Sequence, residues 1–167
     1  GTPSPATIEA IYGAIVAQAR RPVFYEAFGV PDTVEGRFDM VLLHLWMVLR
    51  SLRERPDSER LAQALFDHFC SDMDANLREM GVGDLAVPKR MRAFGEAFYG
   101  RARAYDAALA EGDGALAAAL SRNVYGDPDA AGGGRLAAYA VATLAALAVA
   151  GDAAVRDGVL PFAEPAP

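Results

Sequence analysis

The sequence predicts an all-α protein: a single-domain bundle of about six helices with a central buried helix and an antiparallel helical hairpin. Apolar residues recur with the helical period of 3.6 along most of the chain. The stretch Met40–Leu49 is apolar apart from His44, as expected of a helix that is buried on all sides. With 167 residues and 53% hydrophobic content, the chain can bury one core without disulfides or metals. We therefore treat residues 1–167 as one helical domain.

The first thirty residues predict one helix and one irregular segment. A helix is expected from Pro5 to Arg20, with Ser4 or Thr7 as its N-cap. Its apolar face consists of Ile8, Ile11, Tyr12, Ile15 and Ala19. The aromatic-rich stretch Pro22–Pro31 is bounded by prolines, so we expect an irregular segment there. The side chains expected to hold it on the core are Phe24, Tyr25 and Phe28.

The central helix is expected from Asp32 to about Arg53. Trp46 should fill the largest volume in its surroundings, because it is the largest side chain of this apolar helix. Pro56 cannot continue the helix, and either Asp57 or Ser58 can cap the next one.

A helical hairpin is predicted over residues 61–105. The apolar stripe of its first helix is Ala62, Leu65, Phe66, Phe69, Met73, Leu77 and Met80. Gly81 suits a left-handed position after that helix, and Val82 can close the usual hydrophobic contact. Asp84 can accept backbone N–H bonds in the turn, and Pro88 is tolerated in the first turn of the second helix. The second stripe is Met91, Phe94, Phe98, Ala102, Tyr105 and Leu109.

The C-terminal third predicts two more helices and two irregular segments. A short helix should carry Leu116, Leu120 and Val124 and end at Gly126. The glycine-rich stretch Asp127–Gly134 predicts a mobile loop, and residues 135–150 predict the last helix. We expect residues 151–167 to be an irregular tail that contains too many prolines for a helix. Val159, Leu160 and Phe162 of this tail could lie in a surface groove.

Charge and cysteine content narrow the function classes. The net charge of −6 argues against DNA binding, which normally needs a basic domain. A single cysteine, Cys70, fits a reducing compartment, so we expect a cytoplasmic protein. We expect no transmembrane segment, because the longest apolar run is shorter than the ~18 residues that a span needs. The start of the sequence shows no signal-peptide pattern.

The sequence predicts no catalytic, cofactor or metal site. His44 and His68 could suggest a haem or metal site, but carboxylate-bridged helical sites need Glu-x-x-His pairs. Val41 and Leu65 occupy the glutamate positions here, so we interpret His44 as a buried, hydrogen-bonded structural residue. No serine elbow or phosphate-binding glycine loop is present in the sequence.

Charge is segregated between the two helices of the predicted hairpin. Residues 85–105 hold one acid, Glu96, and five basic residues: Lys89, Arg90, Arg92, Arg101 and Arg103. The preceding helix carries one basic residue, Arg78, among the acids Asp67, Asp72, Asp74 and Glu79. This charge pattern has two explanations. Either the two faces pair across the hairpin, or the basic face binds an anionic partner such as RNA, lipid headgroups or an acidic protein.

Three ordered segments resemble the ubiquinol-cytochrome c chaperone family. They are LHLWMVLRSLRE (residues 43–54), FDHFCSDMDANLREMGVGDLAVPKRMRAFGEAFYGR (residues 66–101) and LAAALSRNVYG (residues 116–126). The resemblance covers about residues 28–126, and the chain is similar to a bacterial-type member of the family. It implies an all-α, non-enzymatic chaperone without a cofactor, which binds newly made cytochrome b during assembly of the respiratory bc1 complex.

The resemblance also suggests partners and a surface. The expected client is cytochrome b or another nascent membrane protein, with the ribosome and the membrane surface as further candidate partners. The candidate contact residues are Lys89, Arg90, Arg92, Phe98, Tyr99, Arg101, Arg103, Asp72, Asp74 and Arg78. A peripheral lipid- or quinone-binding protein is the alternative function, and a haem or metal enzyme is the third.

Overall fold

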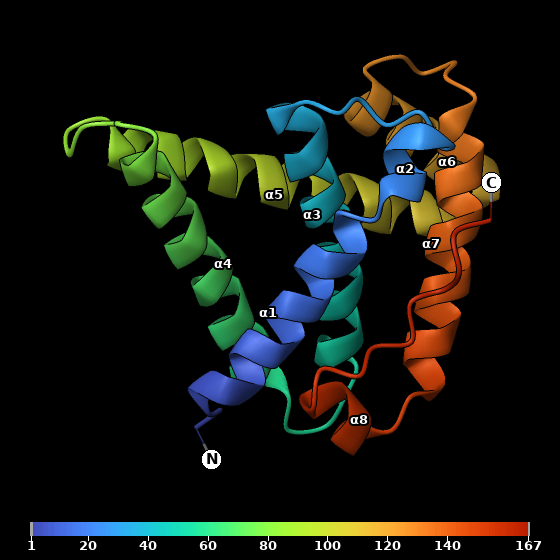
Figure 1. The fold of residues 1–167 in the computed structure, drawn as a ribbon. Coiled ribbons are helices and arrows are strands. Elements are labelled where there is room, and N and C mark those ends of the chain that lie inside the picture. The colour runs from blue at the N-terminus through green and yellow to red at the C-terminus, as the bar shows by residue number, and fades with distance from the viewer. Residues whose placement is uncertain (1, 167) are drawn as a thin grey trace.

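A computed structural model describes residues 2–166, apart from the side chain of Asp113. All regular elements in this range are helical, which confirms the predicted fold class (Figure 1). They are α1 (Pro5–Ala19), α2 (Pro22–Glu26), α3 (Val34–Arg53), α4 (Glu59–Glu79), α5 (Val87–Glu111), α6 (Asp113–Leu120), the π-helical turn η1 (Ser121–Tyr125), α7 (Gly132–Val149) and α8 (Asp152–Arg156). The short helices α2 and α8 lie in segments that were predicted to be irregular.

Helix α3 is the centre of the fold, as predicted. It contacts α1, α4, α5, α7 and η1, and every residue from Leu42 to Leu49 is buried. Because the neighbours surround it, the helix needs apolar side chains on all faces rather than one stripe. Its N-cap is Thr33, whose hydroxyl accepts the Gly36 N–H at 3.0 Å. The predicted start at Asp32 is two residues before the first helical residue, Val34, and the Asp32 carboxylate binds Arg37 instead.

The predicted glycine stop of α4 is confirmed. Gly81 has a φ of +87°, and its N–H donates to the carbonyl of Arg78 at 3.0 Å. The Val82 N–H donates to the carbonyl of Leu77, also at 3.0 Å, which completes a Schellman motif. A residue with a Cβ would be strained at this φ, so glycine ends the helix here.

The N-caps follow the prediction for α1 but not for α4. The Ser4 hydroxyl accepts the Thr7 N–H at 3.1 Å. Ser58 stands at the position before α4, but its hydroxyl donates to the carbonyl of Pro56 at 3.2 Å and makes no cap bond. The predicted cap at Asp57 or Ser58 is therefore wrong in its hydrogen bonding.

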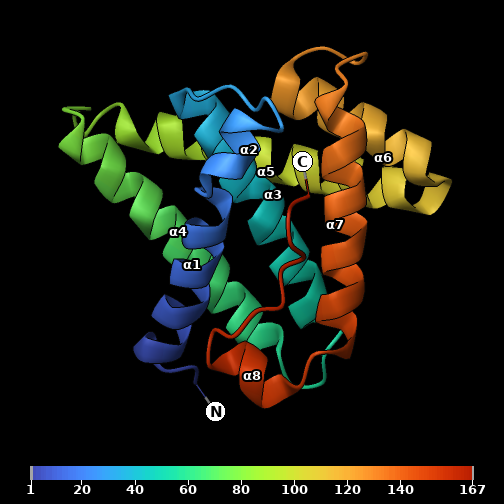
Figure 2. The ribbon, with the colours of Figure 1, turned by 45° about the vertical axis from the view of Figure 1, so that its right-hand side comes forward.

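The hairpin of α4 and α5 opens as a V, with its turn projecting away from the body (Figures 1 and 2). Two polar contacts fasten the second half of α5 to α3. Arg101 lies 2.8 Å from Asp39, while Asp106 accepts from the Trp46 indole at 3.0 Å and from Arg50 at 2.7 Å. The first half of α5 has no such contact with α3, so it extends as an arm beside α4.

The glycines of the predicted loop Asp127–Gly134 lie inside α7 instead. A Cβ on Gly132 would meet the Tyr125 ring at 2.2 Å. A Cβ on Gly133 would lie 1.8 Å from the Ser121 hydroxyl oxygen and 2.5 Å from the carbonyl oxygen of Ala117. These glycines let α7 approach α6 and η1 closely, so the prediction of a mobile loop is wrong for residues 132–134.

The C-terminal tail lies along the helices and closes one side of the core (Figure 2). Leu160 and Phe162 pack against the core, as predicted. Val159 points to solvent, with 65% of its surface exposed, which contradicts its predicted place in a groove. Beyond these residues, the Ala163 N–H donates to the Thr143 hydroxyl at 3.1 Å. The tail is therefore held by side-chain bonds as well as by apolar contact.

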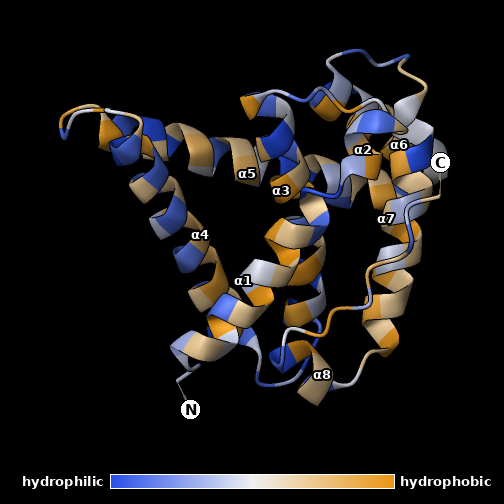
Figure 3. Ribbon diagram, in the orientation of Figure 1, coloured by the Kyte–Doolittle hydropathy of each residue, from blue (hydrophilic) through white to orange (hydrophobic). Residues whose placement is uncertain are grey.

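Helix α7 is long and apolar enough to cross a membrane by length and composition. Its 18 residues have a mean hydropathy of 1.4, and 44% of them are buried inside the fold. No other helix in the described residues passes this test, and core helices of soluble proteins also pass it. Figure 3 shows its apolar residues along the full length of the helix. The bonds of Tyr139 and Thr143 to other parts of the chain tie one face of α7 into the body.

Candidate partner-binding surface

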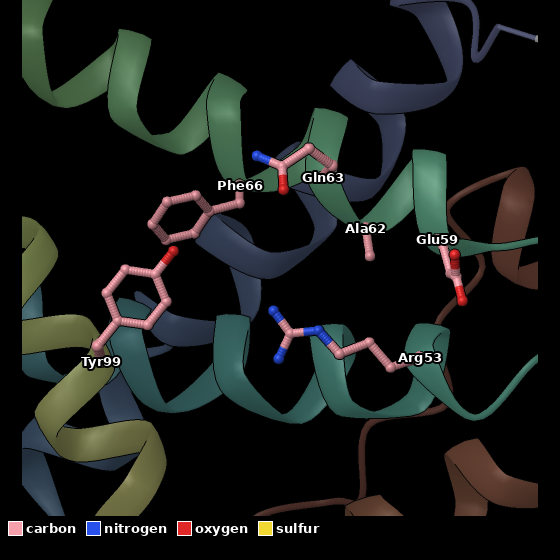
Figure 4. Close-up of a pocket in the computed structure, with 6 residues that line it drawn as sticks. All are labelled: Arg53, Glu59, Ala62, Gln63, Phe66 and Tyr99. Atoms are coloured by element: carbon pink, nitrogen blue, oxygen red, sulfur yellow. The ribbon is translucent and has the colours of Figure 1, made fainter.

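The V between α4 and α5 contains a groove, closed on one side by the end of α3. Its volume is about 400 Å³. The residues that line it are Arg53, Glu59, Ala62, Gln63, Phe66 and Tyr99. Figure 4 shows the Phe66 and Tyr99 rings together at one end and Glu59 at the other, with Arg53 between them. The groove thus joins an aromatic end to a polar end.

The aromatic end is partly open to solvent. Tyr99 is 52% exposed, and its ring centroid lies 5.5 Å from that of the half-buried Phe66. Phe98 is a predicted contact residue like Tyr99, but it is only 1% exposed and packs against Phe66 from inside. The helical turn separates these neighbours, because adjacent residues point in different directions around α5. Of these two neighbours, only Tyr99 is exposed to a partner.

Most of the basic residues on α5 have no acidic partner. Lys89, Arg90, Arg92 and Arg103 are exposed, and no carboxylate of the described chain lies within 4.0 Å of their charged groups. Arg101 is the exception, and its partner Asp39 is on α3. Pairing of α4 with α5 across the hairpin, one of the two predicted explanations of the charge pattern, is therefore wrong.

Asp72 and Asp74 of α4 are hydrogen-bonded to side chains close to them in the fold. Asp72 accepts from the Tyr12 hydroxyl of α1 at 2.7 Å, and burial together with this bond raises the pKa of Tyr12. Asp74 pairs with Arg78 at 2.7 Å, and Arg78 also binds Asp84 in the turn. Asp84 therefore accepts from the Arg78 side chain and not from backbone N–H groups of the turn, contrary to its predicted role. These predicted contact residues act as internal contacts of α1, α4 and the turn.

Replacing Arg101 by alanine should destabilise the fold by about 2 kcal/mol. Removal of one partner from a buried ion pair leaves the other charge uncompensated, although the Arg101 side chain is 25% exposed, which reduces the cost. Burial already raises the pKa of Asp39 to about 6 against the opposing effect of Arg101. Urea unfolding at neutral pH measures the loss. Arg103→Ala is the matched control, expected within about 0.5 kcal/mol of wild type; equal stability of the two variants would contradict the assignment.

His44 is held in a chain of hydrogen bonds that crosses the core. Its Nδ1 lies 2.7 Å from the Met40 carbonyl, so Nδ1 must donate and Nε2 must accept. Nε2 accepts from the Tyr139 hydroxyl at 2.8 Å, and Gln18 donates to that hydroxyl at 3.0 Å. Burial lowers the pKa of His44 to about 4. Both ring nitrogens are thus used for structure, as predicted.

His68 and Cys70 also pack as structural residues. The His68 ring stands edge-on to the Tyr12 ring, with centroids 4.9 Å apart. Cys70 is half-buried against the core, and burial raises the pKa of its thiol. No group of three or more His, Cys, Asp or Glu side chains in the described residues is placed to hold a metal ion.

Sequence reasoning did not find the polar half of the groove. The sequence predicts Arg53 only as the approximate end of the central helix, and no pattern singles out Glu59 or Gln63. Phe66 is predicted as part of the core stripe, but its half-buried ring also lines the groove. These residues meet because α3 ends where the V opens, and a sequence pattern does not record such a crossing.

Comparisons with known proteins match most of the chain to one protein family. The family model for the ubiquinol-cytochrome C chaperone matches residues 26–162. The chain is 29% identical over 115 residues to ubiquinol-cytochrome-c reductase complex assembly factor 1 of Xenopus laevis, covering 68% of this chain and 58% of that protein. It is 32% identical over 107 residues to protein CBP3, mitochondrial, of Saccharomyces cerevisiae, covering 62% of this chain and 32% of that protein.

A solved structure shares the fold closely. The crystal structure of the Cbp3 homolog from Brucella abortus superposes with a TM-score of 0.84 at 41% sequence identity. The match covers 95% of this chain and 90% of the other. The arrangement of helices described above is therefore similar to that of a protein from a bacterium, whereas the chain spans only part of the length of its curated relatives.

Proposed function

Because the chain belongs to the ubiquinol-cytochrome c chaperone family, we propose that it is a non-enzymatic assembly chaperone for the bc1 respiratory complex. We further propose that its client is newly made cytochrome b, bound through the groove between α4 and α5. The Xenopus laevis relative is by name an assembly factor of the ubiquinol-cytochrome-c reductase complex, which supports this class of client. The observation that carries the proposal is the open groove with its accessible aromatic end, on a hairpin whose helix α5 also carries basic residues without acidic partners.

The groove has the chemistry that the end of a transmembrane segment requires. An apolar client helix can bury side chains against Phe66 and Tyr99, as in other helix-in-groove complexes. The polar residues that flank such a segment can meet Arg53, Glu59 and Gln63 at the other end. A chaperone that holds a membrane segment in this way needs no reactive centre.

Charge reversal on α5 tests this proposal. The variant Arg90→Glu, Arg92→Glu, Arg103→Glu should keep the fold, because none of the three side chains has an internal partner in the described chain. We expect it to recover at least about tenfold less cytochrome b when the tagged protein is purified from membranes of its host, since each side chain near an anionic surface contributes about 1 kcal/mol. Mass spectrometry of the purified complex gives the measurement.

The matched control reverses three exposed arginines elsewhere. Arg20, Arg60 and Arg122 are exposed and lie off α5, so the triple variant to glutamate has the same net charge as the test variant. It should recover cytochrome b as wild type does. Unchanged recovery with the α5 variant would argue against the basic face, and absence of cytochrome b from the wild-type sample would refute the proposed client.

The alternative function is a peripheral lipid- or quinone-binding protein, and no specific observation favours its quinone-binding form. Two cavities of the described chain each include charged side chains: Arg53 and Glu59 in the groove, and Arg50 and Asp106 in a second hollow beside α7. A quinone tail would require a closed apolar tunnel. The groove suits a polypeptide better.

A further inference from the structure

The turn of the V presents apolar side chains to solvent. We call residues 80–92 the hairpin tip. Leu85 is 99% exposed there, and Met80, which was predicted to belong to the core stripe, is 68% exposed. Met80 is the C-cap residue of α4, directly after Glu79, and its side chain lies outside the core. The apex of the molecule's longest projection thus carries two large apolar side chains without an internal partner.

Basic residues follow these apolar side chains directly. Lys89, Arg90 and Arg92 are exposed on the first turns of α5, and no carboxylate in residues 2–166 lies within ion-pair distance of them. Residues 78–92 contain four basic and two acidic side chains, a net charge of +2. The chain carries −6, so the remaining residues carry −8. The tip is a positive end on a negative protein.

The arm holds the tip away from the acidic body. From Val87 to Phe94, where the first ring of α5 packs on Phe38 of α3, the helix is roughly 10 Å long. This exceeds one Debye length of ~8 Å at physiological ionic strength, so the charge of the body is partly screened at the tip. Both views show the turn projecting clear of the other helices (Figures 1 and 2).

We propose that the hairpin tip is a membrane contact site that inserts Leu85 and Met80 into the interface of an anionic lipid bilayer. Lys89, Arg90 and Arg92 then lie at the level of the headgroup phosphates and bind them. Anionic lipid attracts the tip and repels the rest of the chain, so the protein stands on the membrane with its tip down. The groove between α4 and α5 then lies at the open end of the V, away from that surface.

Lipid fits these observations better than RNA or an acidic protein surface. Phosphates of RNA would explain the three cations but not a fully exposed leucine at the apex. Interfacial binding requires both, because apolar side chains enter the boundary between headgroups and chains while cations attract anionic lipid. The presence of exposed Leu85 and Met80 next to three cations without acidic partners therefore favours a bilayer.

Flotation with lipid vesicles tests the proposal. The full chain should float with vesicles of phosphatidylcholine and phosphatidylglycerol in equal parts and should not float with phosphatidylcholine alone. The variant Leu85→Ser, Met80→Ser should bind the mixed vesicles about tenfold more weakly, because it removes the inserted apolar surface. The variant Lys89→Gln, Arg90→Gln, Arg92→Gln should bind roughly a hundredfold more weakly. Binding should also weaken as salt is raised.

Two controls separate the tip from exposed apolar residues in general. Val34 and Val159 are 69% and 65% exposed outside the tip, so Val34→Ser, Val159→Ser should bind vesicles as wild type does. Leu85→Trp reports insertion directly, since the single native tryptophan, Trp46, is buried and contributes a constant background. Its emission should shift to shorter wavelength on mixed vesicles.

Equal binding to both kinds of vesicle, or unchanged binding of the Leu85 and Met80 variant, would overturn the proposal. So would retention of ribosomal RNA that depends on the three cations but not on Leu85, in the absence of vesicle binding. The vesicles contain no protein, so the result is independent of cytochrome b and of the proposed client.

Discussion

Replacing Gly133 by alanine is expected to lower the free energy of unfolding by about 3 kcal/mol. The added Cβ would lie 1.8 Å from the Ser121 hydroxyl oxygen and 2.5 Å from the backbone carbonyl oxygen of Ala117. The carbonyl cannot rotate away as a side chain can, so α7 must move away from α6 and η1. Thermal unfolding followed by circular dichroism should show a midpoint roughly 6 to 12 °C lower.

The neighbouring glycine supplies the control for this prediction. A Cβ on Gly134 would meet nothing within 4 Å, although the residue lies in the same turn of α7. Gly134→Ala should therefore raise stability by about 0.5 kcal/mol, because alanine loses less backbone entropy in a helix. Equal effects of the two substitutions would show that helix propensity, and not the close approach at Gly133, sets the outcome.

Lowering the pH from 7 to 4 should cost the fold about 3 kcal/mol through His44 alone. The folded chain holds this imidazole neutral, with its pKa lowered to about 4, whereas the unfolded chain protonates it near 6.5. The unfolded state therefore binds more protons below pH 6.5, and the stability contributed by His44 is lost as the pH falls through that range. Urea unfolding at several pH values between 7 and 4.5 measures the slope.

The substitution His44→Gln isolates this contribution, because glutamine does not titrate. The variant should be less stable than wild type at pH 7, and the difference should shrink as the pH falls. Asp39 acts in the opposite direction, since its folded pKa is raised to about 6 and its contribution declines as the pH rises, but it is present in both proteins and cancels. A pH-independent difference would contradict the assignment of the pKa to His44.

The helices themselves were largely predictable because their signals are local. The Ser4 cap, the glycine end of α4 and the continuous apolar run of α3 each depend on residues within a few positions of one another. The candidate surface was predictable only in part. The basic residues of α5 were found by counting charge, but the separation of Arg101 from its neighbours depends on Asp39, which is 62 positions away in the chain.

The amino-acid pattern by itself determined an all-helical protein, its central helix and the family resemblance that points to an assembly chaperone. The tertiary structure decided which residues of α5 remain available to a partner, why Gly132 and Gly133 belong to a helix, and where the groove opens. The physical reason is the distance along the sequence between the residues that interact. Helix periodicity and capping are set by neighbours along the chain, whereas burial and charge pairing are set by the crossing of helices that are distant in sequence.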